Sequence, residues 1–195
     1  MKTKKWLMFL IACFFSASFV FFVSPLWAQE DTSKEQKRAD VRKMAGDTLS
    51  RLYKVQPSAK KSVESAAGYA VFSNFGLKIL VVGSGSGKGI AVNNKTKKET
   101  FMKMLEVQAG LGWGAKKFRL VWIFENNAVL NSFINSGWTL GGQTTAAAKV
   151  SDQGGALAGA MSVSPGVWLY QLTDDGLALE LTAKGTKYYK DDGLN

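Results

Sequence analysis

The side chains best suited to acid–base or nucleophilic catalysis are scarce in this sequence. It contains no histidine, and its single cysteine, Cys13, lies in an apolar run near the start of the sequence. Two carboxylate pairs remain, Asp174-Asp175 in a predicted turn and Asp191-Asp192 near the last residue. A glycosidase needs two carboxyl groups across a cleft, one of them kept neutral by burial, and the pattern does not indicate that arrangement. We therefore expect no enzymatic activity, no metal and no other cofactor.

A glycine-rich run over residues 83–89 is the segment that most suggests a phosphate site. A P-loop has the form GxxxxGK followed by Ser or Thr, but here Gly89 follows Lys88, and Val82 stands where the first glycine belongs. The dinucleotide-binding fingerprint fails too, because its third glycine is misplaced and no helix is predicted to follow. We expect either a flexible or bent β connection or a kinked strand, near the mouth of a ligand site, with Lys88 as a contact to an anionic head group.

Basic residues, by contrast, are abundant. The sequence has 25 Lys and Arg against 15 Asp and Glu, a net charge of +10, and without the three lysines of residues 1–28 it keeps 22 basic residues and a charge of +7. One cluster is Lys116, Lys117 and Arg119, at the start of a predicted strand. A second surrounds a predicted hairpin and consists of Lys95, Lys97, Lys98 and Lys103. A positive surface favours anionic partners such as phospholipid head groups; the alternative is a solvated surface that only maintains solubility.

Tryptophan offers a second kind of contact with lipid, because its ring suits a membrane–water interface. Trp122 is predicted to be a core residue, since its strand is apolar on both faces. Trp138 follows Gly137, which is predicted to end a short helix, and is the better interface candidate. The candidate lipid-binding residues are therefore Lys88, Lys103, Lys116, Lys117, Arg119 and Trp138.

Residues 1–28 have the three-part pattern of a secretory signal. Met1–Lys5 is basic, Trp6–Val23 is apolar or small, and cleavage is predicted after Ala28. Cleavage leaves a periplasmic or secreted protein. Two alternatives stay open: an uncleaved membrane helix, which needs roughly 20 apolar residues, and a lipoprotein acylated at Cys13.

The remainder predicts helices followed by strands. Residues 29–66 form a helical segment, with helices over 31–55 and 58–66; the first has an apolar stripe at three- and four-residue steps, which we expect to pack on the domain. Residues 67–195 form a mainly β, lipid-binding core, in which strand 118–124 alternates its faces. We predict one α+β domain: N-terminal helices packed on a bent, barrel-like antiparallel β-sheet, with one short helix inserted near residues 127–136.

Ten short sequence segments follow one another along the chain in an order typical of a known family. They are AAGYAVF at 66–72, GSGSGKGIAV at 83–92, TFMKM at 100–104, GLGWG at 110–114, VWIF at 121–124, GW at 137–138, VWLYQLT at 167–173, GLAL at 176–179, GTKYY at 185–189 and DGLN at 192–195. In order and spacing they resemble the SYLF family, specifically its bacterial secreted members, from about Arg38 onward. Gly193 departs from the pattern, where a second acidic residue is expected, and this affects no functional inference.

The resemblance implies lipid binding, because eukaryotic relatives bind phosphoinositides and bacterial relatives look like envelope proteins. The family has no agreed catalytic residues to carry over. We therefore expect an exported, non-catalytic protein of the bacterial envelope that binds anionic phospholipid or phosphoinositide-like head groups through a basic rim, with other envelope proteins as further partners. Nucleic acid is not expected despite the pI of about 9.7, because export argues against it and no recognition motif is present. The alternative is a periplasmic structural or protein-interaction module without a lipid ligand.

Overall fold

The computed structural model describes most of the chain beyond residue 25. Its backbone is described over 26–79, 82–109, 114–140, 149–150, 157–174, 176–178 and 185–195, and its side chains over 31–74, 85–106, 117–139, 157–174, 176–178 and 185–195. Residues 1–33 and 34–195 are separate units, and the domain below is the second. The predicted signal, with Cys13, lies almost entirely outside the described residues, and its cleavage remains a prediction.

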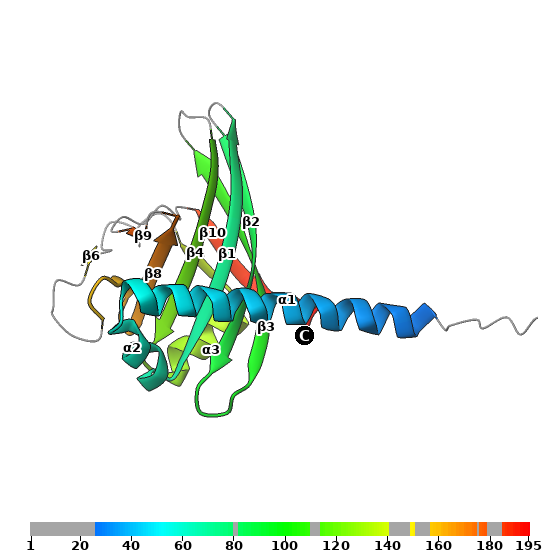
Figure 1. The fold of residues 1–195 in the computed structure, drawn as a ribbon, viewed down its shortest axis with the longest axis horizontal. Coiled ribbons are helices and arrows are strands. Elements are labelled where there is room, and N and C mark those ends of the chain that lie inside the picture. Colours follow the sequence, from blue (N-terminus) through cyan, green and yellow to red (C-terminus); the bar gives the residue numbers. More distant parts are fainter. Residues whose placement is uncertain are drawn as a thin grey trace, which may run out of the picture. The chain divides into compact units, whose positions relative to one another are not determined.

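Three helices and one sheet make up the described chain. The helices are α1 (Leu26–Val55), α2 (Ala59–Ser65) and α3 (Asn127–Ser136). The strands are β1 (Gly68–Ile79), β2 (Val82–Asn93), β3 (Glu99–Ala109), β4 (Gly114–Phe124), β5 (Trp138–Leu140), β6 (Lys149–Val150), β7 (Met161–Ser164), β8 (Val167–Thr173), β9 (Gly176–Ala178) and β10 (Thr186–Lys190). They pair antiparallel in the order β5-β10-β3-β2-β1-β4-β8-β7-β6, with β9 beside β8. The sheet curls into a half-barrel, so the predicted α+β fold is confirmed (Figure 1).

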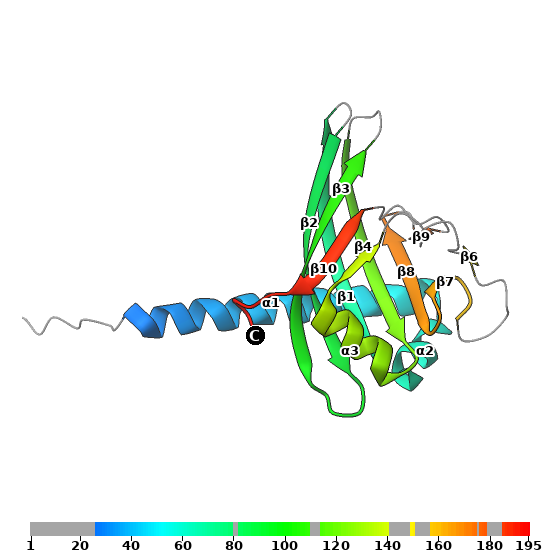
Figure 2. The same cartoon turned by 180° about the vertical axis from the view of Figure 1, so that it is seen from behind.

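The two faces of the sheet carry different helices. α1 crosses one face (Figure 1), and α3 lies against the other, as the view from behind shows (Figure 2). Strand β4 demonstrates the predicted alternation: Phe118, Leu120, Trp122 and Phe124 belong to the cluster on the α3 side, and Val121 and Ile123 to the cluster on the α1 side. The period of two therefore sorts the side chains of each strand between two cores.

Helix α1 packs on the sheet through its predicted apolar stripe. Val41, Ala45, Thr48 and Leu52 are buried, at steps of three and four residues. The Thr48 hydroxyl donates to the Met44 carbonyl oxygen at 2.7 Å, which satisfies the buried polar side chain. The prediction that this stripe packs on the domain is confirmed for residues 34–55.

The α3 face holds the larger aromatic cluster. Phe133 of α3 lies 4.9 Å from Phe124, 5.5 Å from Trp122 and 5.5 Å from Tyr188, measured between ring centroids. α3 begins as predicted, because the Asn126 side chain accepts a hydrogen bond from the Val129 N–H at 3.0 Å. Aromatic pairs of this kind contribute about 0.5–1.5 kcal/mol beyond the area that they bury.

The glycine-rich run belongs to a regularly paired strand, so of the two predicted alternatives the strand is correct and the connection is wrong. β2 pairs with β1 and with β3 along its whole length. A Cβ atom on Gly89 would lie 2.2 Å from Cδ1 of Phe72, and one on Gly87 would lie 2.6 Å from Cγ of Met104. Glycine is needed here because large side chains of the neighbouring strands fill the space above β2. The run marks tight packing on the α3 face, and its alternate residues, including Lys88, face α1.

Candidate anion-binding groove

A row of directly opposed residues crosses five strands on the α1 face. Tyr189 of β10 is opposite Lys103 of β3, which is opposite Lys88 of β2, which is opposite Ser73 of β1; Ser73 in turn is opposite Arg119 of β4. Opposed residues of antiparallel strands share a face and lie about 4.5–5.5 Å apart at Cβ. The register therefore gathers three cationic side chains that lie far apart in the sequence.

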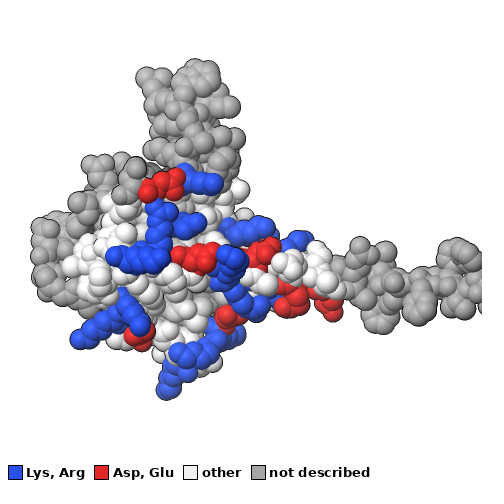
Figure 3. All heavy atoms as spheres, viewed as in Figure 1, with Lys and Arg blue, Asp and Glu red and all other residues white. Residues whose placement is uncertain are grey.

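Between this row and α1 lies a groove of about 440 Å³, which we call the α1 groove. Its lining residues are Lys37, Asp40, Val41, Met44, Ser73, Asn74, Ser86, Gly87, Lys88, Lys103, Met104, Leu105, Lys117 and Tyr189. Four of them are lysines, one from α1 and three from three different strands. Figure 3 shows Lys and Arg side chains gathered over α1 and over the strands that it crosses. The groove combines positive charge with apolar walls.

A smaller hollow of about 140 Å³ adjoins the α1 groove, with Ser73 and Lys117 lining both. It also contains Arg51 and Arg119. Arg51 is already engaged, since its guanidinium donates to the main-chain oxygens of Thr173 and Asp174 and lies 3.7 Å from the Asp174 carboxylate. Arg119 forms no ion pair within the described part of the chain. Of the three cations that line this hollow, the two predicted ones, Lys117 and Arg119, thus have no ion-pair partner among the described side chains.

The lysines of the α1 groove differ in their partners. Lys103 Nζ lies 2.8 Å from Oδ1 of the buried Asp191, and the hydrogen bond from this lysine to Asp191 raises the pKa of Lys103. Among the residues whose side chains are described, Lys37, Lys88 and Lys117 have no carboxylate within ion-pair distance. Lys88 stands directly opposite Lys103, and like charges so placed destabilise a sheet. An anion in the groove would relieve this repulsion.

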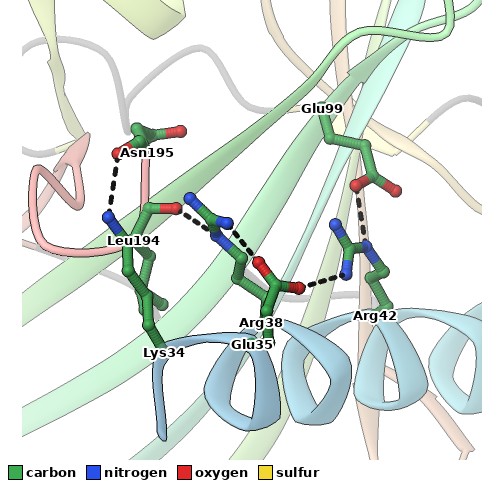
Figure 4. A network of polar contacts seen from close by, with 7 residues as sticks. All are labelled: Lys34, Glu35, Arg38, Arg42, Glu99, Leu194 and Asn195. Carbon is green, nitrogen blue, oxygen red and sulfur yellow. Dashed lines mark hydrogen bonds and ion pairs between the residues drawn. The ribbon is translucent and has the colours of Figure 1, made fainter. Parts of the chain in front are cut away.

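Helix α1 is held in place from the flank opposite the groove. Arg42 Nε donates to the Glu99 carboxylate at 2.8 Å, and Arg38 Nε donates to the Leu194 carbonyl oxygen at 2.8 Å (Figure 4). Both guanidinium groups also lie over the ring of Phe101, at 5.8 Å for Arg38 and 5.2 Å for Arg42. At 100° per residue, Arg42 and Met44 lie on opposite flanks of the helix. The clamp therefore fixes α1 without occupying the groove.

Asn195 completes this clamp, which also includes Arg38, Arg42, Glu99 and Phe101. Its side-chain carbonyl accepts from the Phe101 N–H at 2.9 Å, its amide donates to the Phe101 carbonyl oxygen at 2.8 Å, and its main-chain oxygen accepts from Lys34 Nζ at 3.3 Å. Glu35 lies between Arg38 and Arg42 and pairs with both (Figure 4). Asn195 thus connects the two elements: its side chain is hydrogen-bonded to the main chain of Phe101 in β3, and its main-chain oxygen to Lys34 in α1.

The structure brings four of the six predicted site residues together and places one elsewhere. Lys88, Lys103 and Lys117 line the α1 groove, and Arg119 lies in the adjoining hollow. The side chain of Lys116 falls outside the described residues. Trp138 lies apart from them, on the α3 face, where its ring is 5.5 Å from that of Trp122. Packing of β5 against the aromatic cluster explains this position, which is not that of a groove residue.

Sequence reasoning missed several residues of the groove. Lys37, Met44, Leu105 and Tyr189 were not among the candidates, although all four line it. For the strand residues a signal existed: Leu105 is four residues from the buried Phe101 on β3, and so shares its face. Nothing in the sequence indicated which flank of α1 would border the groove.

The described residues contain no group of three or more His, Cys, Asp or Glu side chains placed to hold a metal ion. Among the described residues, no helix is both long and apolar enough to cross a membrane. What the groove offers chemically is cationic ammonium groups beside an apolar wall.

No protein-family model matches the chain. The chain is similar to beta cell expansion factor A of Aeromonas veronii, with 34% identity over 169 residues, which cover 84% of this chain and 60% of that protein. The chain thus spans less than two thirds of that relative's length, and the relative's name specifies no ligand. The resemblance to the SYLF family stays a prediction.

Proposed function

We propose that this protein is an exported, non-catalytic envelope protein that binds anionic phospholipid at the α1 groove and its rim. The observation that carries the proposal is the convergence of Lys88, Lys103 and Lys117, from three strands, with Lys37 of α1. A sheet that served stability alone would gain from avoiding opposed lysines. Three of these four lysines, Lys88, Lys103 and Lys117, are head-group contacts predicted from the sequence.

Apolar side chains at the rim support a membrane surface as the source of the anion. Leu105 and Tyr189 are large, exposed apolar residues, with exposed fractions of 46% and 37%. They lie on neighbouring strands, beside Lys103 and Lys187. Exposed aliphatic and tyrosine side chains flanked by lysines suit the boundary between head groups and acyl chains.

Co-sedimentation with vesicles tests the proposal. We expect the protein to bind vesicles containing phosphatidylglycerol but not vesicles of phosphatidylcholine, and to dissociate as salt is added, because exposed charges are screened. The double variant Lys88→Glu with Lys117→Glu should bind at least about tenfold more weakly, since each lysine near an anionic surface contributes about 1 kcal/mol.

The matched control changes the same charge elsewhere. Lys95 and Lys98 are exposed in the turn between β2 and β3 and do not line the groove. The variant Lys95→Glu with Lys98→Glu should keep nearly the affinity of the unaltered protein. Equal loss in both double variants would indicate that net charge alone drives binding, and no binding to any vesicle would favour a protein-interaction module instead.

A further inference from the structure

We propose that the α1 groove holds a single alkyl chain whose anionic head group is bound by Lys88 and Lys117, so that the protein carries one amphiphile and does not only adhere to a surface. This inference rests on the proposed function, because the same lysines bind the head group in both. The proposed function concerns the head group alone. Here an alkyl chain also fills the apolar part of the groove, which would stay empty if the protein only adhered to a membrane surface.

The walls of the groove are suited to a hydrocarbon chain. On the α1 side they are formed by Val41 and Met44, and on the sheet side by Leu105, with Tyr189 at the rim. Leu105 has no apolar cover over nearly half of its surface, and burying such a side chain against a chain would be favourable at about 25 cal/mol per Å². Methionine is unbranched and adapts to an irregular occupant.

The size of the groove argues for one chain. Its volume of about 440 Å³ lies near the lower end of the range of roughly 300–1,000 Å³ for small-molecule sites. A two-chain phospholipid bound here would leave chain outside the protein. The clamp formed by Arg38, Arg42 and Asn195 keeps α1 at a set position, so the groove exists before the ligand arrives, which lowers the entropic cost of binding.

The charges place the head group at the sheet. Lys103 is neutralised by Asp191. On the α1 side the groove is lined by Asp40, whose carboxylate accepts from Gln36 and would repel an anionic head group, so the head group lies on the sheet side. Lys88 and Lys117 lack such a partner among the described side chains, and Ser73 lies opposite Lys88 as a hydroxyl donor. A carboxylate or a phosphate at this point would meet two ammonium groups and one hydroxyl.

Displacement of a dansylated fatty acid from the full protein tests the inference. The competitors are laurate, a lauroyl lysophosphatidate, and monolaurin as the neutral chain, all below their micelle concentrations. We expect one probe per protein, displaced by both anions and at least tenfold less well by monolaurin. The better anionic competitor distinguishes a fatty acid from a lysophospholipid as the source. Equal competition by monolaurin, or several probes per protein, would overturn the inference.

Variants that fill the groove separate this inference from surface binding. Met44→Trp, and independently Leu105→Trp at a more exposed position, should weaken probe binding at least tenfold. Val55→Trp is the control, because Val55 is exposed on the same helix and does not line the groove. Vesicle binding should survive Met44→Trp.

The combined results are decisive for both proposals. Vesicle binding without probe binding rejects the alkyl-chain site and leaves the proposed function standing. Probe binding without vesicle binding rejects adhesion to the membrane surface and supports the groove. The absence of both rejects the two together.

Discussion

On the α3 face of the sheet, aromatic rings pack edge to face and glycines of β2 make room for them. On the α1 face the same strands carry lysines, an open groove and a helix held partly by ion pairs and hydrogen bonds. The first arrangement maximises contact within the fold. The second leaves volume unfilled and opposes like charges, which lowers stability.

Under the proposed function, the α1 groove is where ligand binding takes precedence over stability. Proteins depart from good packing and charge pairing mainly where a ligand or partner completes the arrangement. The α3 face is not wholly apolar, since it buries the polar atoms Trp122 Nε1, Thr186 Oγ1 and Tyr188 Oη. Even so, that face is closed, whereas the α1 groove is accessible. Substitutions on the α3 face should therefore change stability, and substitutions in the groove should change binding.

The largest expected effect is that of Phe133→Ala on the α3 face. Phe133 is buried and touches four aromatic neighbours, Phe72, Phe124, Trp138 and Tyr188, besides Trp122. Its truncation should lower the free energy of unfolding by about 3–5 kcal/mol, measured by urea denaturation. Leu105→Ala in the groove is the comparison and should stay within about 0.5 kcal/mol. An equal loss of unfolding free energy in the two variants would show that the two faces contribute alike to stability.

Alkaline titration should give an intermediate effect and distinguish the tyrosines of the two faces. On the α1 side, burial, with smaller contributions from Tyr69 and Glu64, raises the pKa of Tyr53 to about 12. On the α3 side, complete burial raises the pKa of Tyr188 well above its usual value of 10.0. Unfolded tyrosines release their protons near pH 10, so the folded state binds more protons above that pH. Stability should then fall as pH rises through 10, by at most about 1.4 kcal/mol per pH unit for each tyrosine that stays protonated.

Tyrosinate absorbance, recorded together with near-ultraviolet circular dichroism, measures this difference. Tyr53 should ionise within the folded protein near pH 12, and Tyr188 only as the protein unfolds. Tyr188→Phe should remove the component that coincides with unfolding, because it removes the ionisable hydroxyl and keeps the ring that packs in the aromatic cluster. Ionisation of Tyr188 in the folded state would show that the α3 face admits water.

The smallest expected effect is a gain of stability in the groove. Lys88→Gln removes the repulsion with the opposed Lys103, which should stabilise the protein by about 0.2–1 kcal/mol at low salt and less at high salt. Lys95→Gln in the turn should leave stability unchanged. Urea denaturation at two salt concentrations measures both. A loss of stability in Lys88→Gln would mean that Lys88 serves the fold, contrary to the proposed role.

Much of the fold followed from local patterns. The alternation on β4, the stripe on α1 and the short helix α3 each depend on neighbouring residues, and each was predicted. Local pattern left the glycine run open between a connection and a strand, because the reason for its glycines lies in Phe72 and Met104 on other strands. The separation of Trp138 from the groove lysines was likewise not visible in the sequence, since its neighbours come from β4, β10 and α3.

The residue inventory was enough to direct attention to anion binding, because the absence of histidine and the surplus of lysine are properties of composition. Which lysines act together was settled by strand register and by the path of α1 across the sheet. Register depends on pairing between segments far apart in the chain, and a shift of one residue would turn Lys88 or Lys103 to the other face. Local periodicity contains no information about that choice, so the groove exists only in the folded protein.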